Sequence, residues 1–194
     1  MIYVTSDLHG YHKNICYGTS NWDDKASNCR DFTNVYEMNY AIAESINNKL
    51  TKGDTLIELG DFAFGGCINV YSFRKMLRVD NIIHINGNHD NLIKRNAIIP
   101  CISGIDKEVG LRSLFKEVHD APYIYTYKGY EFICSHYPPK DNTDFNKPNT
   151  IWLHGHCHNK NDKDEIHSKY NVFDVCWNGE ILFLDDIINK LKIV

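Results

Sequence analysis

The chain has 194 residues, of which 43% are hydrophobic and 24% charged, a composition that indicates one globular domain over residues 1–194 and excludes wholesale disorder. The net charge is −4 and the 21 lysines and arginines are dispersed, which argues against long nucleic acid as a partner. The apolar runs are too short to span a bilayer and the first residues do not resemble a secretion signal, so we expect a cytoplasmic protein without a membrane partner.

The first half of the chain alternates strand and helix patterns. Asn34 and Glu37 have the spacing of a capping box, and the apolar residues after them recur at helical spacing, which predicts a helix to about Lys49. A second helix is predicted over 70–78, and the polar stretch over 18–31 is predicted to be a long loop. Short runs rich in β-branched residues predict strands over 2–5, 55–59 and 82–85.

The second half of the chain is richer in strand patterns. Lys128-Gly129 separates two runs of aromatic and β-branched residues, which predicts a hairpin of strands 123–127 and 130–134. A final short helix is predicted to begin at Asp185. Further strands are predicted over 150–153, 172–175 and 181–184. This order of elements predicts two sheets packed together, with helices outside them.

Polar residues of metal-binding type follow the ends of five predicted strands. Asp7 and His9 lie two positions apart and so point the same way in an extended chain, as do His156 and His158. Glycines in these segments allow sharp turns, and sites in α/β sheets form at the carboxyl ends of strands. The five segments are Asp7-Leu8-His9, Gly60-Asp61, Gly87-Asn88-His89-Asp90, Ser135-His136 and Gly155-His156-Cys157-His158.

The ligand types indicate a class of metal. Two carboxylates, one amide and four imidazoles form a mixed oxygen and nitrogen set without thiolate, which suits Mn, Fe, Zn or Ni better than Ca or Mg. Seven side chains exceed the needs of one tetrahedral ion. They match two ions that share a carboxylate and lie about 3.5–4 Å apart. The sequence therefore predicts two divalent metal ions as cofactors.

In their order, the five segments resemble the motifs of the calcineurin-like metallophosphoesterase superfamily, and they cover most of the chain. The resemblance implies an α/β fold, a four-layer α/β/β/α sandwich with two mixed sheets, and a hydrolase of phosphate esters. The chain is most similar to the small phage and bacterial phosphoesterases, and a phage gene would place the protein in the host cytoplasm. That similarity rests on His12-Lys13-Asn14-Ile15, Arg30-Asp31-Phe32, Glu37-Met38-Asn39 and Leu59-Gly60-Asp61-Phe62.

The resemblance also implies the role of each motif residue. Manganese is the favoured metal, and a hydroxide that bridges the two ions is expected to attack phosphorus. The seven ligands are Asp7, His9 and His158 on one ion, Asn88, His136 and His156 on the other, and Asp61 between them.

Three further residues are candidates for contacts with the substrate. His89 is expected beside the leaving oxygen, as a proton donor or as a hydrogen bond to the phosphoryl group. His12 and Arg30 are candidates for additional phosphate contacts, and an arginine suits a bidentate clamp.

One motif departs from part of the superfamily. In its phosphoprotein phosphatases the second motif continues as Gly-Asp-x-x-Asp-Arg-Gly, where the arginine contacts phosphate and the second aspartate orients the histidine of the third motif. This chain has Phe62-Ala63-Phe64-Gly65-Gly66 instead. We therefore favour a phosphodiesterase over a phosphatase, and the group that orients His89 stays open. Phe62 and Phe64 either wall the pocket or pack in the core.

Several alternatives remain. Gly-Asp and Gly-Asn are ordinary turn sequences, so each motif alone carries little weight. A phosphomonoesterase or nucleotidase, a nuclease acting on short substrates, and a metal-binding protein-interaction scaffold with little activity are the competing functions. Scaffolds of this kind usually lose ligands, whereas all seven and His89 are present here. The expected partner is a small phosphate-ester or nucleotide substrate, and no segment identifies a subunit interface.

Overall fold

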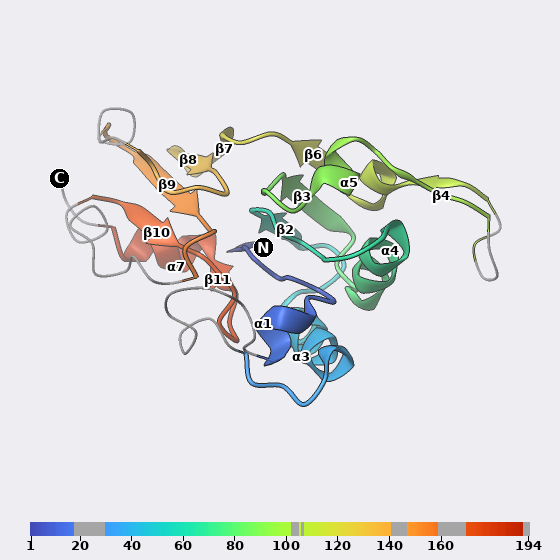
Figure 1. The fold of residues 1–194 in the computed structure, drawn as a ribbon. Helices are drawn as coiled ribbons and strands as arrows, with labels where there is room; N and C mark the ends of the chain where they lie inside the picture. Colours follow the sequence, from blue (N-terminus) through green and yellow to red (C-terminus); the bar gives the residue numbers. More distant parts are fainter. Residues whose placement is uncertain (18–29, 102–104, 106, 141–146, 159–169, 192–194) are drawn as a thin grey trace.

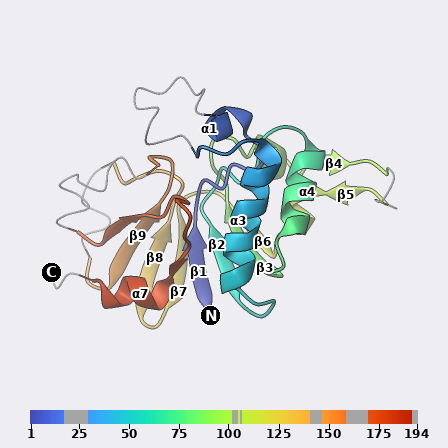
Figure 2. The same ribbon diagram turned by 90° about the horizontal axis from the view of Figure 1, so that it is seen from below.

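The structure is a computed structural model that describes residues 1–17, 30–101, 105, 107–140, 147–158 and 170–191. These residues form a mixed α/β fold with two main sheets, which confirms the predicted class. Figures 1 and 2 show the two sheets beside each other, with most of the helices gathered against only one of them.

The first sheet has five strands in the order β11-β1-β2-β3-β6. The pairs β1–β2, β2–β3 and β3–β6 are parallel, whereas β11 runs antiparallel to β1. The carboxyl ends of four strands therefore lie at one edge of this sheet. The strands are β1 (Ile2–Thr5), β2 (Thr55–Glu58), β3 (Asn81–Ile85), β6 (Glu117–His119) and β11 (Leu182–Phe183).

Helices cover one face of this sheet (Figure 2). The longest is α3, and Asn34 caps it as predicted, because its Oδ1 accepts the backbone N–H groups of Tyr36 and Glu37 at 3.0 and 2.9 Å. The helix ends at Lys49, also as predicted. The helical segments on this side are α1 (Lys13–Tyr17), α3 (Val35–Lys49), α4 (Cys67–Met76), α5 (Asn91–Lys94) and the 3-10 helix η1 (Leu111–Leu114).

The second sheet has four strands in the order β10-β9-β8-β7. The predicted hairpin is confirmed, since β7 and β8 are antiparallel and Tyr127 lies opposite Tyr130. The pairs β8–β9 and β9–β10 are parallel, so the carboxyl ends of β8 and β9 also share one edge. The strands are β7 (Tyr123–Tyr127), β8 (Tyr130–Cys134), β9 (Thr150–His154) and β10 (Val172–Asp174).

Neighbouring residues of the first sheet face two different cores. Tyr3 and Leu56 pack against the helices, while Val4 and Ile57 pack against the second sheet, where Phe132 is among their neighbours. Burial on both faces explains why β1 and β2 are apolar without alternation. A last helix, α7 (Leu184–Asn189), contacts β1 and β11 and adds side chains to the core between the sheets.

Some predicted boundaries are wrong by a few residues. The helix predicted over 70–78 is α4, which begins earlier and ends at Met76. It ends there because the Arg74 guanidinium binds the carbonyls of Leu77 and Val79 at 3.1 and 2.9 Å, which holds the following chain extended. The last helix begins one residue before Asp185.

Six short elements were not predicted. Each spans at most five residues, too few for a periodic pattern to be visible. They are α1, α5, η1, β6 and the hairpin of β4 (Ile98–Ile99) with β5 (Val109–Gly110), which projects to one side of the molecule in Figure 1. The loop predicted over 18–31 falls mainly on 18–29, outside the described residues. Within the part of the chain that the structure describes, no helix is long and apolar enough to cross a membrane.

Candidate metal centre

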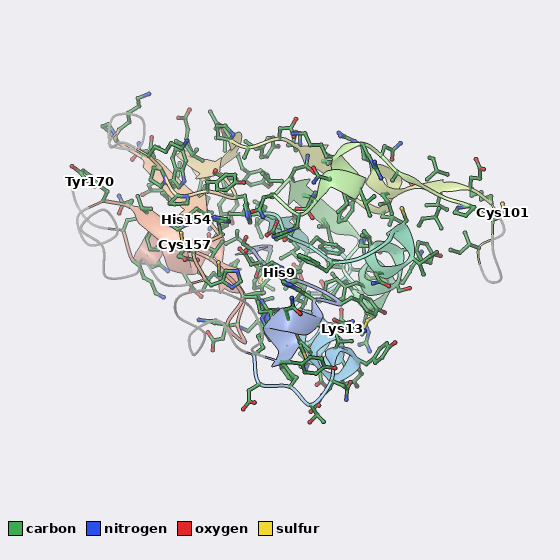
Figure 3. The ribbon with its side chains drawn as sticks, viewed as in Figure 1. His9, Lys13, Cys101, His154, Cys157 and Tyr170 are labelled. Carbon is green, nitrogen blue, oxygen red and sulfur yellow. The ribbon has the colours of Figure 1, made fainter. Side chains whose placement is uncertain are left out.

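The predicted ligands come together where the two sheets meet. β1, β2 and β3 deliver Asp7, Asp61 and Asn88 just beyond their carboxyl ends, and β8 and β9 deliver the histidines of the second sheet. A bridge between Ser6 and Cys176 fixes the first strand beside the segment that follows β10. Figure 3 shows His9 near the middle of the molecule, with His154 and Cys157 marking the end of β9 toward it.

The backbone at the ligands is unusual. Ten non-glycine residues in the described ranges have positive φ, and five of them are predicted ligands: Asp7, His9, Asp61, His156 and His158. Such conformations cost on the order of 1–3 kcal/mol each and persist where surrounding structure imposes them, most often at functional sites. Gly60 contributes to the same turn, because it has φ of 98° and a Cβ there would lie 2.5 Å from the nitrogen of Gly87.

One group of donors consists of Asp7, His9 and His158. Asp7 Oδ1 lies 3.5 Å from His9 Nε2 and 3.4 Å from His158 Nε2, and the two imidazole nitrogens are 3.3 Å apart. Donor atoms held by one tetrahedral ion at about 2.1 Å lie roughly 3.4 Å from one another. These three side chains could therefore hold one metal ion.

The Asp7 carboxylate is oriented by its second oxygen. Oδ2 accepts the Ser6 hydroxyl, the backbone N–H of His156 at 2.9 Å and the Cys176 thiol at 3.0 Å. Oδ1 has no hydrogen-bond partner among the described residues and is buried. Although burial acts to raise the pKa of Asp7, the close contact with the His9 ring and the neighbouring imidazoles lower it overall. The Asp7 side chain is therefore a carboxylate whose Oδ1 atom is available to bind a metal ion.

The second group of donors surrounds His136. Its Nδ1 lies 2.9 Å from the Leu59 carbonyl, which can only accept, so Nδ1 carries the proton and Nε2 presents a lone pair in the neutral ring. Nε2 faces Asn88 Oδ1 at 2.9 Å, Asp61 Oδ2 at 3.6 Å and the Nδ1 atom of His156 at 3.2 Å.

This arrangement fits a cation. With the proton on Nδ1, the Nε2 lone pair of His136 points at an amide oxygen and a carboxylate oxygen, and a cation among these atoms would offset their mutual repulsion. Asp7, Asp61 and His136 also form a group of donors close enough to hold an ion. The two groups share Asp7 and adjoin each other, so the described residues could hold two neighbouring ions.

Asp61, a member of the second group, also faces the first. Its Oδ2 is 3.9 Å from His9 Nε2 and 3.6 Å from His136 Nε2, and its Oδ1 accepts the His89 N–H at 2.9 Å. Burial, followed by the charge of Asp7, raises the pKa of Asp61 to about 8. A carboxyl group with such a raised pKa needs a nearby cation to ionise readily at neutral pH.

Asp90 connects two of the ligand segments. Its Oδ2 accepts the N–H groups of Asp61 and Gly87 at 2.6 and 2.8 Å, and its Oδ1 accepts that of Phe62 at 3.1 Å. Behind it, His84 is fully buried and its Nδ1 is 2.6 Å from Glu58, while its Nε2 is 3.6 Å from Asp90. Sequence reasoning did not assign Asp90, His84 or Glu58. The signal for Asp90 was its place in the third motif.

His89 lies at the open side of the site. Its side chain is 42% exposed and its Nε2 is 3.8 Å from Asp61 Oδ2. Partial burial lowers its pKa, which favours the neutral ring. The Phe64 ring contacts it, with centroids 4.5 Å apart, and stacks on His12 at 3.7 Å. Phe64 therefore lies against both histidines beside the site, whereas Phe62 is buried in the core.

His12 and Arg30 occupy different surroundings. His12 is close to the site, with its ring centroid 5.1 Å from that of His9. Arg30 instead directs both terminal nitrogens to the carbonyls of Asp7 and Leu8 and lies over the Trp177 ring, 4.7 Å from its centroid. Arg30 thus holds the first ligand segment in place. Phosphate contacts by these two residues stay predictions.

Comparison with known proteins shows relatives of this chain, but none of them has a described activity. No protein-family model matches the chain. It is 30% identical over 166 residues to the uncharacterized protein MJ1445 of Methanocaldococcus jannaschii, covering 84% of this chain and 72% of that protein, and it belongs to the same family. A crystal structure of AQ665 from Aquifex aeolicus, a protein of unknown function, has the same fold, with a TM-score of 0.66, 22% identity and coverage of 97% of this chain and 98% of that one.

Proposed function

We propose that this protein is a dinuclear-metal phosphoesterase of the calcineurin-like metallophosphoesterase type, with a four-layer α/β/β/α form and a preference for diesters. The observation that supports the proposal best is the convergence of seven donors from five separate segments into two adjoining groups that share Asp7. A chance set of turn residues would not gather at one point with their lone pairs facing one another.

The side chains suggest how the two ions would be held. The first would lie among Asp7, His9 and His158, and the second among the donors around His136, with Asp61 between them. When bound, two divalent ions supply Lewis acidity toward phosphoryl oxygens and lower the pKa of a water molecule. Manganese suits the mixed oxygen and nitrogen donors, as do Fe, Zn and Ni.

The exposure of the donors indicates from which side a substrate would reach the site. Asp7, His9 and His136 are buried, whereas Asn88, His89 and His156 are exposed. A phosphate ester would therefore approach over the exposed residues, with the buried ones beneath. There, the N–H group of His89 can donate a hydrogen bond to a phosphoryl oxygen, and the protonated ring can donate a proton to the leaving oxygen.

The test is metal-dependent hydrolysis of two generic substrates. Protein stripped of metal receives Mn²⁺, Ni²⁺, Zn²⁺ or Mg²⁺ in turn and is assayed with bis-p-nitrophenyl phosphate and p-nitrophenyl phosphate. We expect turnover with Mn²⁺ and a preference for the diester. A preference for the monoester would replace the diesterase with a monoesterase, and two bound ions without turnover would favour a scaffold.

A matched pair of variants separates the site from the rest of the protein. His136→Ala removes a donor, whereas His119→Ala removes a partly exposed histidine that pairs with Glu117 outside the site. We expect His136→Ala to lose bound metal and activity together and His119→Ala to keep both. Equal effects of the two substitutions would contradict the proposal.

A further inference from the structure

A cleft of 690 Å³ opens beside the candidate metal centre. Gly87 and Asn88 on one side and Ser135 on the other line it, so it borders the loops that carry the ligands. Its far wall is the connection from β6 to β7, residues 120–122, which crosses the top of the molecule in Figure 1. An ester bound through its phosphate at the metal centre would have one substituent next to this opening.

The size of the cleft points to a large substituent. Pockets of about 300–1,000 Å³ hold organic ligands of drug size. A phosphate group with a methyl or ethyl ester would leave most of the cleft filled with water. The space beside Asn88 therefore suits a diester in which at least one substituent is as large as a nucleoside.

Two aromatic residues line the cleft. Tyr137 is 42% exposed, and its ring contacts those of His136 and His156 edge-on, with centroids 5.0 and 4.8 Å apart. Trp152 donates its indole N–H to the Tyr137 carbonyl at 3.3 Å and is half-buried. Tyr137 thus extends from the ligand histidines into the cleft, and Trp152 continues the aromatic lining. Such side chains bind planar rings by stacking.

Polar and charged groups share the lining with Ala121, Pro122, Pro138 and Pro139. Lys94 pairs with Asp120 at 3.1 Å, and Lys140 is exposed at the rim, so the cleft carries one net positive charge in a protein of net charge −4. Asn91 presents an exposed amide that can donate and accept hydrogen bonds. The apolar and aromatic side chains suit the faces of a heterocycle, and the amides and lysines suit its polar edges and an attached anion.

We propose that this cleft binds the nucleoside portion of a phosphate-diester substrate, with the base against Trp152 and Tyr137 and its edge toward Asn91. The inference rests on the proposed phosphoesterase function and names the class of substrate for it. The sequence offered no sign of the cleft, because its walls come from α5, the β6–β7 connection, the segment after β8, and β9.

The test compares two diesters with the same leaving group. Thymidine 5′-(p-nitrophenyl phosphate) carries a nucleoside, and methyl p-nitrophenyl phosphate does not. With Mn²⁺-loaded protein we expect kcat/KM to favour the thymidine ester by about tenfold or more, the range of one stacked base. Trp152→Leu, which removes an aromatic wall, and Asn91→Trp, which fills the cleft from an exposed position, should each reduce that ratio about tenfold.

Tyr40→Leu is the matched control, since Tyr40 is an exposed aromatic residue on α3 that does not line the cleft. We expect it to leave the ratio of the two kcat/KM values unchanged. A wild-type ratio near one, or a ratio that neither Trp152→Leu nor Asn91→Trp alters, would overturn the assignment of the cleft while leaving the phosphoesterase intact.

A binding measurement separates this inference from the proposed function. Thymidine 5′-monophosphate is titrated into Mn²⁺-loaded wild-type protein and into the Asn91→Trp variant by calorimetry. Binding that the substitution weakens about tenfold, in a protein that hydrolyses neither ester, would support the nucleoside site and refute the hydrolase. Equal binding by both proteins would refute the site whatever the activity.

Discussion

Replacing Asp61 with asparagine is expected to stabilise the metal-free protein and to weaken its response to metal. The carboxyl group is 3% exposed, and burial first and the Asp7 charge second raise its pKa to about 8. Asparagine keeps an oxygen that can accept the His89 N–H, and it tolerates the left-handed backbone at this position. The variant therefore removes the buried charge with little change in shape.

The pKa sets the size of the effect. A rise from 3.8 to about 8 corresponds to on the order of 5 kcal/mol of unfavourable ionisation at about 1.4 kcal/mol per pH unit. Rearrangement of the site around the ionised group reduces this value. We expect the variant to be more stable at pH 8 by about 2–3 kcal/mol, or roughly 5–10 °C in Tm for a chain of this length.

The difference in stability between the wild-type protein and the variant depends on pH. A carboxyl group whose pKa is raised on folding stabilises the folded state below its unfolded pKa, and this stabilisation is lost as the pH rises through the folded pKa. Metal-free wild-type protein should thus lose stability between about pH 4 and pH 8 relative to the variant. Glu58, whose pKa burial raises to about 7, is present in both proteins and cancels in the comparison.

The assay is calorimetry of protein treated with EDTA at pH 5, 6, 7 and 8, followed by addition of Mn²⁺. The difference in Tm should grow from small at pH 5 to its largest value at pH 8, and Mn²⁺ should raise the wild-type Tm more than the Tm of the variant. Asp186→Asn, at an exposed position on α7, is the control and should show neither effect. A variant less stable than wild type at every pH and equally stabilised by Mn²⁺ would refute the reasoning.

Three further substitutions test individual roles. His89→Ala should keep both metal ions by elemental analysis but lower kcat by about 10² or more, and a parallel loss of metal would contradict a role in proton transfer. Arg30→Ala should lower the free energy of unfolding by about 2 kcal/mol, because the carbonyls of Asp7 and Leu8 lose their donors. Unchanged stability with a raised KM would instead support the phosphate contact predicted from the sequence. Asp90→Asn should weaken metal binding about 10-fold or more in titration, since it disturbs the N–H groups held by the carboxylate, and unaltered affinity would limit Asp90 to a role in packing.

Much of the donor set was predictable because the signal is local. Each ligand follows a short apolar run and a turn, and parallel pairing of β1, β2 and β3 brings Asp7, Asp61 and Asn88 to the same edge. The sequence could not show which oxygen of Asp7 is free, because that depends on Ser6 and Cys176, and Cys176 lies 169 residues away in the chain. Contacts over such separations depend on packing rather than on pattern.

The group that orients His89 was left open by the sequence for a related reason. The motif lacks the aspartate found in phosphoprotein phosphatases, and the substitute is an aromatic ring rather than another charge. The ring of Phe64, in the turn after Asp61, contacts both His12 and His89. Arg30, for which the sequence predicts a phosphate contact, binds the main-chain carbonyls of Asp7 and Leu8, a contact for which the sequence carries no signal.

The left-handed backbone at five ligands connects the fold with the proposed chemistry. At on the order of 1–3 kcal/mol per residue, this strain would unfold the loops unless other contacts offset it. Asp90 offsets part of it by holding three N–H groups of the second and third ligand segments, and Arg30 does the same for the first. Bound metal would supply the remainder, since an ion favours only the conformation that directs all its donors inward. Removing metal should therefore loosen the ligand loops first and leave the sheets intact, a difference that hydrogen exchange would detect as lost protection confined to the segments after β1, β2 and β9.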